Sequence, residues 1–212
     1  MQSSGRRSPR DPDATRAGLL RAAFQEVHRS GFQGTDLDTI LRTAGLTKGA
    51  LYHHFENKDA LGYALVDEFL MDLTREKWLR PLADATDPVE ALTRIVQTTS
   101  LKPRDVENGC PVNNLAQEMA PLDEGFRRRV SRVFEEWRSG IAAALRTGQR
   151  RGLVRADLDP DEAATFFIAA YEGFISLAKA AQDPRVLQAG RKSLTRHLES
   201  LRAPRRRPAA RA

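Results

Sequence analysis

The stretch that decides the fold runs from residue 37 to residue 55 and reads LDTILRTAGLTKGALYHHF. Leu37 and Ile40 begin an apolar face at helical spacing, and Gly45 then supplies a residue that enters a left-handed turn without steric cost. Leu51 follows the turn at the position where an apolar side chain packs between two helices. The pattern predicts a helix-turn-helix.

The second helix of this motif carries side chains that suit a phosphate backbone. Thr47 is placed to cap the helix, whose free N–H groups and positive dipole end attract anions. Gly49 allows close approach of the backbone, and Lys48, Tyr52, His53, His54 and Lys58 add polar groups of different reach. This chemistry favours DNA binding. The alternative is a capping Thr beside a solvated, purely structural surface.

Most of the chain outside this motif also has the apolar periodicity of helices. The first helix runs through Ala17 and Val27 and ends at Gly31, and Thr35 can cap the next one. Pro103 to Gly109 is predicted to be a loop. Further helical stripes cover residues 61–73, 89–96, 111–119, 126–145, 163–180 and 185–201. No segment alternates as a strand would, so the predicted fold is all-α with about nine helices.

The positive charge is concentrated at the two ends of the chain. The 212 residues have a net charge of +6, of which three arginines lie in the head and five in the tail: Arg6, Arg7, Arg10, Arg202, Arg205, Arg206, Arg207 and Arg211. Removing these eight charges leaves the rest of the chain at −2. Residues 1–12 and 203–212 are predicted to be disordered and basic, which suits nucleic acid or serves solubility alone.

Composition also indicates where the chain works. One cysteine cannot form an internal disulfide, which favours a reducing compartment. No apolar run approaches 18 residues and the first residues lack a signal-peptide core. The expectation is a cytoplasmic protein without a membrane partner.

The run from Gly45 to Phe55, followed by Asn57-Lys58-Asp59-Ala60-Leu61, resembles the signature of tetracycline-repressor (TetR) family regulators. The resemblance covers about residues 13–62. It implies a homodimeric transcriptional repressor in which residues 13–58 bind a palindromic operator in double-stranded DNA. Residues 59–202 are then expected to bind a small-molecule effector and to dimerise.

The resemblance also assigns roles to individual positions of the motif. Lys48, Gly49 and Tyr52 are expected to face the major groove. Thr35 belongs to the same expected DNA-binding set. The side chains expected to favour phosphates are Thr47, His53, His54 and Lys58.

The expected effector domain offers Cys110 as its most distinctive residue. Cys110 lies at a predicted helix start, a position that can lower a thiol pKa, so it is either a sensor or, as we favour, an ordinary packed residue. Asn113 and Asn114 can orient a ligand or satisfy backbone groups. The candidate pocket residues are Trp78, Cys110, Asn113, Asn114, Phe134, Trp137, Phe167 and Tyr171.

The apolar helix from Ala163 to Ala180 has more apolar surface than one core face needs. Together with the last helix it is predicted to form the dimer interface, as a four-helix arrangement about a two-fold axis. The candidate interface residues are Phe166, Ala170, Gly173, Leu177, Leu194 and Leu198.

Other function classes lack the residues that they need. His53 and His54 do not form the two-histidine helix of a zinc protease, and Pro160 interrupts the acidic residues that could suggest a calcium loop. No nucleotide-binding glycine motif is present, so we expect no catalytic residue, metal or cofactor. A helical adaptor without a DNA role is the remaining alternative, and salt-dependent DNA binding distinguishes the two.

Overall fold

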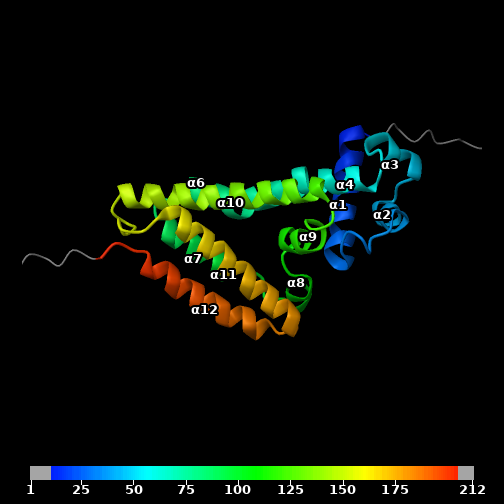
Figure 1. Cartoon of the computed structure of the whole chain (residues 1–212). Coiled ribbons are helices and arrows are strands. Elements are labelled where there is room, and N and C mark those ends of the chain that lie inside the picture. Colours follow the sequence, from blue (N-terminus) through cyan, green and yellow to red (C-terminus); the bar gives the residue numbers. More distant parts are fainter. Residues whose placement is uncertain (1–10, 205–212) are drawn as a thin grey trace, which may run out of the picture. The chain divides into compact units, whose positions relative to one another are not determined.

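The computed structural model describes residues 11–204, and these form an all-helical fold (Figure 1). This confirms the predicted fold class. The helices are α1 (Pro12–Ser30), α2 (Leu37–Ala44), α3 (Lys48–His54), α4 (Lys58–Ala64), α5 (Met71–Thr74), α6 (Arg80–Ala83), α7 (Pro88–Thr98), α8 (Pro103–Asn108), α9 (Pro111–Met119), α10 (Glu124–Arg150), α11 (Pro160–Ala181) and α12 (Pro184–Ser200). Two π-helical stretches, η1 (Leu65–Leu70) and η2 (Arg75–Leu79), interrupt the run from α4 to α6.

The described chain divides into two compact units. The first holds the residues up to Met71 together with Asn114–Val130, and the second holds Asp72–Asn113 together with the residues from Ser131 onward. In the first unit α1 packs against α2, α3 and α4. Leu19 and Leu20 of α1 are buried in this core, as are Ile40 and Leu51.

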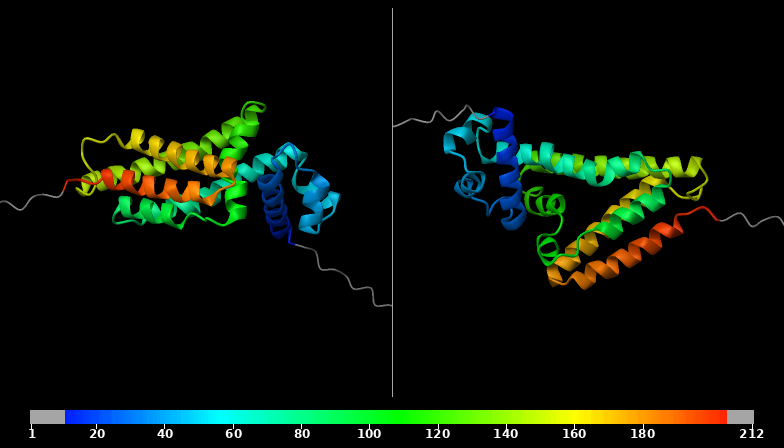
Figure 2. Two further views of the ribbon diagram at one scale, coloured as in Figure 1. Left: turned by 90° about the horizontal axis from the view of Figure 1, so that it is seen from below. Right: turned by 180° about the vertical axis from the view of Figure 1, so that it is seen from behind.

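The second unit has a large apolar core built around two tryptophans. Trp78 and Trp137 lie with their ring centroids 4.6 Å apart, and both are buried. α11 and α12 lie side by side in every view and run in opposite directions (Figures 1 and 2). Phe167 of α11 and Leu194 and Leu198 of α12 complete this core.

The prediction of a loop at residues 103–109 is wrong, because Pro103–Asn108 forms α8. Pro103 occupies the first turn, where its missing N–H costs nothing. The buried Val106 of α8 packs with Ala178 and Leu187, which lie far along the sequence. A six-residue helix held by such distant contacts leaves little periodicity for the sequence to reveal.

Two further expectations need correction. The helical run predicted over residues 61–73 extends further, to Ala83, and η2 provides wider turns just before Pro81, which lacks an N–H to donate. Arg202, one of the five arginines counted with the basic tail, belongs to the fold: its guanidinium donates to Asp87 at 2.5 Å and to Glu199 at 2.7 Å. The other arginines of the head and tail lie outside the described residues.

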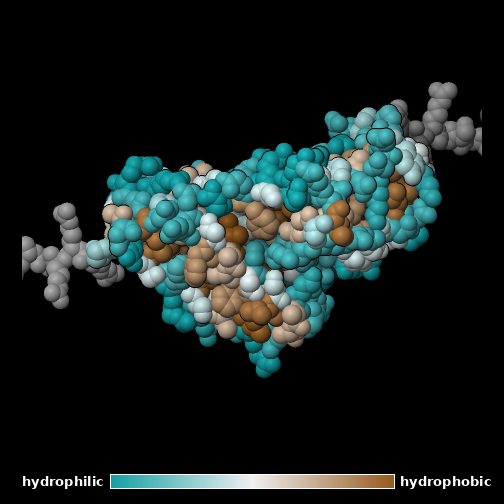
Figure 3. Space-filling view, viewed as in Figure 1, coloured by the Kyte–Doolittle hydropathy of each residue, from teal (hydrophilic) through white to brown (hydrophobic). Residues whose placement is uncertain are grey.

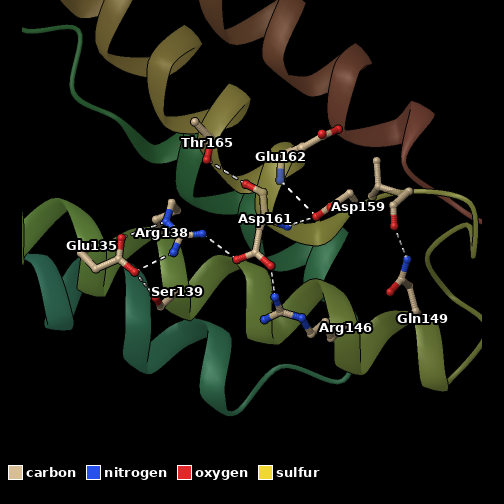
Figure 4. A network of polar contacts seen from close by, with 10 residues as sticks. Glu135, Arg138, Ser139, Arg146, Gln149, Asp159, Asp161, Glu162 and Thr165 are labelled. Carbon is tan, nitrogen blue, oxygen red and sulfur yellow. Dashed lines mark hydrogen bonds and ion pairs between the residues drawn. The ribbon is translucent and has the colours of Figure 1, made fainter.

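A polar network joins α10 to the start of α11 (Figure 4). Asp159 caps α11 by accepting from the backbone N–H of Asp161 at 2.7 Å. The Asp161 carboxylate accepts from Arg138 at 2.6 Å and also pairs with Arg146. Hydrogen bonding to Arg138 holds the pKa of Asp161 below its usual value. These contacts fix the direction in which α11 leaves the preceding loop.

Candidate nucleic-acid interface and ligand cavity

The helix-turn-helix has the geometry that its sequence predicted. Gly45 adopts a left-handed conformation with φ 63° and ψ 38°, and the N–H of Leu46 donates to the carbonyl of Leu41 at 3.0 Å. Thr47 caps α3 by accepting from the N–H of Ala50 at 3.3 Å. Leu51 is 1% exposed between the helices. The short turn thereby fixes which face of α3 points outward.

The outward face of α3 is polar and open. Thr47, Lys48, Gly49 and His53 are exposed, and Tyr52 has 55% of its surface exposed. His54 is half-buried, and its ring lies 5.0 Å from that of His53. A large aromatic side chain left in solvent beside a lysine is available for contact with another molecule.

Two lysines of the candidate interface are held by neighbouring groups. Lys48 pairs with Asp38 of α2 at 2.9 Å, and this hydrogen bond raises the pKa of Lys48. The Lys58 ammonium donates to the carbonyl of Gln33 at 3.3 Å and lies 4.9 Å from the centre of the Phe32 ring. Both ammonium groups are therefore positioned by the fold.

Thr35 is placed differently from the other candidate DNA-binding residues. It is only 4% exposed, and its hydroxyl donates to the carbonyl of Gly31 at 2.6 Å. The residue at the cap position of α2 is Asp36, and its side chain makes no capping hydrogen bond. The expectation that Thr35 caps α2 is wrong, because its hydroxyl closes the turn after α1 instead.

The turn between α1 and α2 is held by a residue that the sequence did not single out. The Glu118 carboxylate accepts from the backbone N–H of Phe32 at 2.9 Å and of Gln33 at 2.8 Å. Gly31 has φ 76°, and a Cβ at that position would lie 2.9 Å from both carboxylate oxygens of Glu118. Glycine therefore satisfies both the backbone conformation and the close approach.

The second unit contains a partly enclosed cavity of about 170 Å³. Three aromatic side chains line it: Trp78, Trp137 and Tyr171. The rings of Trp78 and Tyr171 are nearly perpendicular, with centroids 4.9 Å apart. A cavity of this volume accommodates a ligand of about the size of a substituted benzene ring.

The structure brings together only part of the predicted pocket. Trp78, Cys110, Trp137 and Tyr171 line the cavity. Asn113 and Phe134 line a neighbouring, more open cavity of about 440 Å³ instead. Phe167 is 1% exposed in the core, and Asn114 lies in the first unit. Phe167 was predicted from a helix face that the fold uses for packing.

Three polar side chains form a chain of contacts on the cavity wall. The Lys77 ammonium donates to the Tyr171 hydroxyl at 2.8 Å, and this hydroxyl lies 3.1 Å from the Thr99 hydroxyl. Lys77 also lies 5.1 Å from the centre of the Trp78 ring. Burial raises the pKa of Tyr171, and the charge of Lys77 acts in the opposite direction.

Glu172 is the second residue that sequence reasoning missed. It is 7% exposed, lines both cavities, and its carboxyl oxygens have no hydrogen-bond partner of good geometry among the described residues. Burial raises the pKa of Glu172 to about 7, and the Cys110 thiol and Lys77 ammonium oppose this more weakly. The sequence gives one indication of this residue, because Glu172 is the single acidic residue in the apolar stretch between Ala163 and Ala180.

Cys110 does not have the activated thiol that its helix-start position suggested. Burial raises the pKa of the Cys110 thiol well above its usual range, and the neighbouring Glu172 acts in the same direction. The effect of backbone N–H groups of Asn113 and Val112 is favourable to the thiolate but smaller. A neutral thiol is consistent with packing against a ligand and not with rapid nucleophilic attack.

The candidate dimer residues fall into two groups. Phe166 and Leu177 of α11 are 55% and 59% exposed, Gly173 between them is also exposed, and Ala170 is half-buried. Figure 3 shows apolar surface gathered along this helix. Leu194 and Leu198 of α12 are 3% and 0% exposed within the core of their own chain. They are therefore not available for contact with a second subunit, and their inclusion was wrong.

Two further negative findings apply to the part of the chain that the structure describes. No helix among residues 11–204 is long and apolar enough to cross a bilayer. The same residues contain no group of three or more His, Cys, Asp or Glu side chains arranged to hold a metal ion.

Comparison with family models matches both parts of the chain. Residues 19–65 match the model described as bacterial regulatory proteins of the tetR family, and residues 85–194 match the model of a tetracyclin repressor-like C-terminal domain. The first match contains the helix-turn-helix, and the second contains most of the residues that line the cavity.

Curated relatives agree with this assignment. The chain is 32% identical over 191 residues to the transcriptional regulator AcuR of Cereibacter sphaeroides, covering 88% of this chain and 87% of the relative. It is also 32% identical over 160 residues to the HTH-type transcriptional repressor DhaR of a Mycobacterium species, covering 76% and 80%.

Solved structures share the fold. A TetR transcriptional regulator from Chloroflexus aurantiacus matches with a TM-score of 0.80 and 29% identity over 92% of this chain and all of that one. A regulatory protein TetR from Rhodobacter sphaeroides matches with a TM-score of 0.74 and 31% identity over 86% and 98%. The chain belongs to the TetR family. It is thus a DNA-binding transcriptional regulator and not an enzyme.

Proposed function

We propose that this regulator is a homodimeric repressor that binds a palindromic operator and is released by a small-molecule effector. Residues 13–58 contact the operator, and residues 59–202 bind the effector and dimerise. The observation that carries the proposal is the outward face of α3, where Lys48 and the 55%-exposed Tyr52 stand beside a tightly packed glycine turn.

The roles of individual residues follow from their exposure. Tyr52 and Lys48 reach base edges in the major groove, and Gly49 allows the backbone to approach the duplex. Thr47, His53, His54 and Lys58 contact phosphates and set the register of the helix on DNA. The buried Thr35 contributes through the turn that it closes, and its side chain is left out of the contact surface.

Residues 13–60 contain six basic and six acidic residues, so the DNA-binding part has no net attraction for a polyanion. One DNA-binding domain of this kind binds DNA weakly. Two domains related by a two-fold axis bind an operator more tightly, because the binding free energies of the two half-sites add. The exposed apolar face of α11 supplies the dimer contact in the proposal, through Phe166, Ala170, Gly173 and Leu177.

The ligand cavity supplies the release step. A mostly apolar, partly enclosed site with a few converging polar groups is the form that small-molecule sites take in proteins. The name of the relative DhaR states that it is a repressor, which supports the same direction of control for this chain. The regulator is proposed to work in the cytoplasm, where its DNA lies.

One experiment tests the proposal directly. The full chain is mixed with sheared genomic DNA of its source, and the retained fragments are sequenced at two salt concentrations. We expect an enriched palindrome with half-site centres about 34–36 Å apart, or a multiple of that distance, and retention that falls as salt rises. Retention without any enriched sequence would contradict the proposal.

A further inference from the structure

We propose that the effector is a small organic cation whose protonated nitrogen pairs with the Glu172 carboxylate inside the aromatic cavity of the second unit. The inference rests on the proposed effector-binding role of that cavity. It begins from a buried carboxyl group in the cavity lining. Glu172 is 7% exposed, lines the cavity, and has no hydrogen-bond donor of good geometry among the described residues.

Burial of an ionisable carboxyl without a partner is unfavourable, and a ligand that supplies a cationic donor removes this penalty. Within the fold only the Cys110 thiol, which is a weak hydrogen-bond donor, and the charge of Lys77 favour the ionised carboxyl, and the effect of burial outweighs both. The Lys77 ammonium, which is close enough to influence Glu172, is directed to the Tyr171 hydroxyl at 2.8 Å. The carboxyl is thus left for a group from outside the chain.

The rest of the wall suits the same ligand. Trp78, Trp137 and Tyr171 present aromatic rings to the cavity, and the faces of such rings attract cations within about 6 Å of their centres. Lys77 already shows this property of the wall, because its ammonium lies 5.1 Å from the Trp78 ring centre and 5.2 Å from that of Tyr171. A cavity of about 170 Å³ limits the ligand to about one substituted ring.

An anionic ligand is the competing possibility, since Lys77 and the unpartnered indole N–H of Trp137 are donors. Lys77 is an exposed residue, however, so water shares its charge, and the neutral N–H of Trp137 attracts an anion less strongly than a carboxylate attracts a cationic donor. The charged and titratable groups that line the two cavities beside Glu172 are Lys77, Asp105, Cys110, Glu135, Arg138 and Tyr171. Arg138 is paired with Glu135 and Asp161.

The test uses three probes of one shape: benzylamine, benzyl alcohol and benzoate, measured by titration calorimetry at pH 6 on the full-length protein. We expect benzylamine to bind at least tenfold more tightly than either of the others. Because Glu172 then changes from protonated to ionised, binding should release close to one proton, seen as a dependence of the heat on buffer ionisation.

Two variants separate the charge effects. Glu172→Gln keeps the volume and should remove both the preference for benzylamine and the proton release, leaving benzyl alcohol binding unchanged. Lys77→Met should strengthen benzylamine binding and weaken that of benzoate. Circular dichroism of each variant establishes that it is folded. If Glu172→Gln does not fold, Lys77→Met still tests the effect of charge on the binding of the three probes.

The opposite results would overturn the inference: benzoate binding most tightly, benzylamine affinity unchanged in Glu172→Gln, or no binding of any probe to the folded protein. Binding to the operator is measured separately on the same samples. Loss of selective amine binding with intact operator binding rejects the ligand class alone. Absence of sequence-specific DNA binding rejects the proposed function itself.

Discussion

The carboxylate of Glu118 accepts a hydrogen bond from the backbone N–H of Phe32 at 2.9 Å. A second hydrogen bond, from the N–H of Gln33 at 2.8 Å, uses the other carboxylate oxygen. One side chain of α9 therefore satisfies two backbone donors in the turn that separates α1 from α2. Phe32 itself is buried, with its ring 4.6 Å from that of Phe126.

Replacing Glu118 should loosen this turn. Glu118→Ala leaves two backbone N–H groups without their charged acceptor, and we expect a loss of about 1–3 kcal/mol in the free energy of unfolding. Urea denaturation followed by circular dichroism measures it. Gln117→Ala, an exposed change on the same helix, is the matched control and should have almost no effect. Equal midpoints for the two variants would show that the contact contributes nothing to stability.

The apolar face of α11 gives a prediction about assembly. Gly173 is exposed, and a Cβ placed there would meet no atom within 4 Å, so Gly173→Glu should fold normally as a monomer. A buried carboxylate at the proposed dimer interface should nevertheless separate the subunits. Sedimentation velocity measures the association, and operator binding should fall with it.

The control for Gly173→Glu is Ala143→Glu, which adds the same charge at an exposed position of α10. This variant should remain a dimer. If Gly173→Glu also remained a dimer with full operator affinity, the assigned interface would be incorrect.

Cys110 should react slowly with alkylating reagents. Burial raises the pKa of its thiol, so almost none of it is thiolate at pH 8. We expect iodoacetamide to modify Cys110 more slowly than it modifies free cysteine, and Cys110→Ser to keep both operator binding and the response to effector. Mass spectrometry gives the rate. Alkylation faster than that of free cysteine, coupled to loss of operator binding, would instead identify a sensor thiol.

The buried carboxyl of Glu172 should make stability depend on pH. The pKa of Glu172 is about 7 in the fold and close to the ordinary glutamate value of 4.5 in the unfolded chain, so the folded chain binds more protons between these values. The contribution of Glu172 to the free energy of unfolding is therefore fully present below about pH 4.5 and is lost as pH rises through 7. The loss is on the order of 3 kcal/mol in the absence of ligand.

Glu172→Gln tests this linkage, because it removes the titrating group and leaves the other shifted carboxylates in place. The difference in unfolding free energy between the variant and the original chain should grow in favour of the variant from pH 5 to pH 8. Parallel pH profiles would mean that Glu172 does not titrate in this range.

Much of the helical fold could be predicted because its signals are local. Gly45 determines a turn through its own backbone, and Asp159 caps α11 through N–H groups two and three residues away. α8 and the π-helical stretches escaped prediction because distant contacts or small changes in helix winding determine them. Val106 shows the first case, since Ala178 and Leu187, the buried residues of its cluster, lie more than 70 residues along the chain.

The sites divide in the same way. The outward face of α3 follows from one short motif, so its exposed residues were accessible to sequence reasoning. The cavity required Lys77, Thr99 and Glu172, from three separate helical regions, to converge. Leu194 and Leu198 show a further limit: helical periodicity identifies an apolar face but does not say whether the same chain or a second copy covers it.

The most direct test of the DNA-reading surface compares the original chain with Tyr52→Ala on two duplexes, the operator enriched from genomic DNA and a scrambled sequence of equal length. Tyr52 is 55% exposed, so the variant should keep its helicity and its dimer. Fluorescence anisotropy should show operator binding weakened by about 1–3 kcal/mol, with a much smaller change on the scrambled duplex. Equal affinity of the two proteins for the operator would contradict the assignment of α3 as the element that reads DNA.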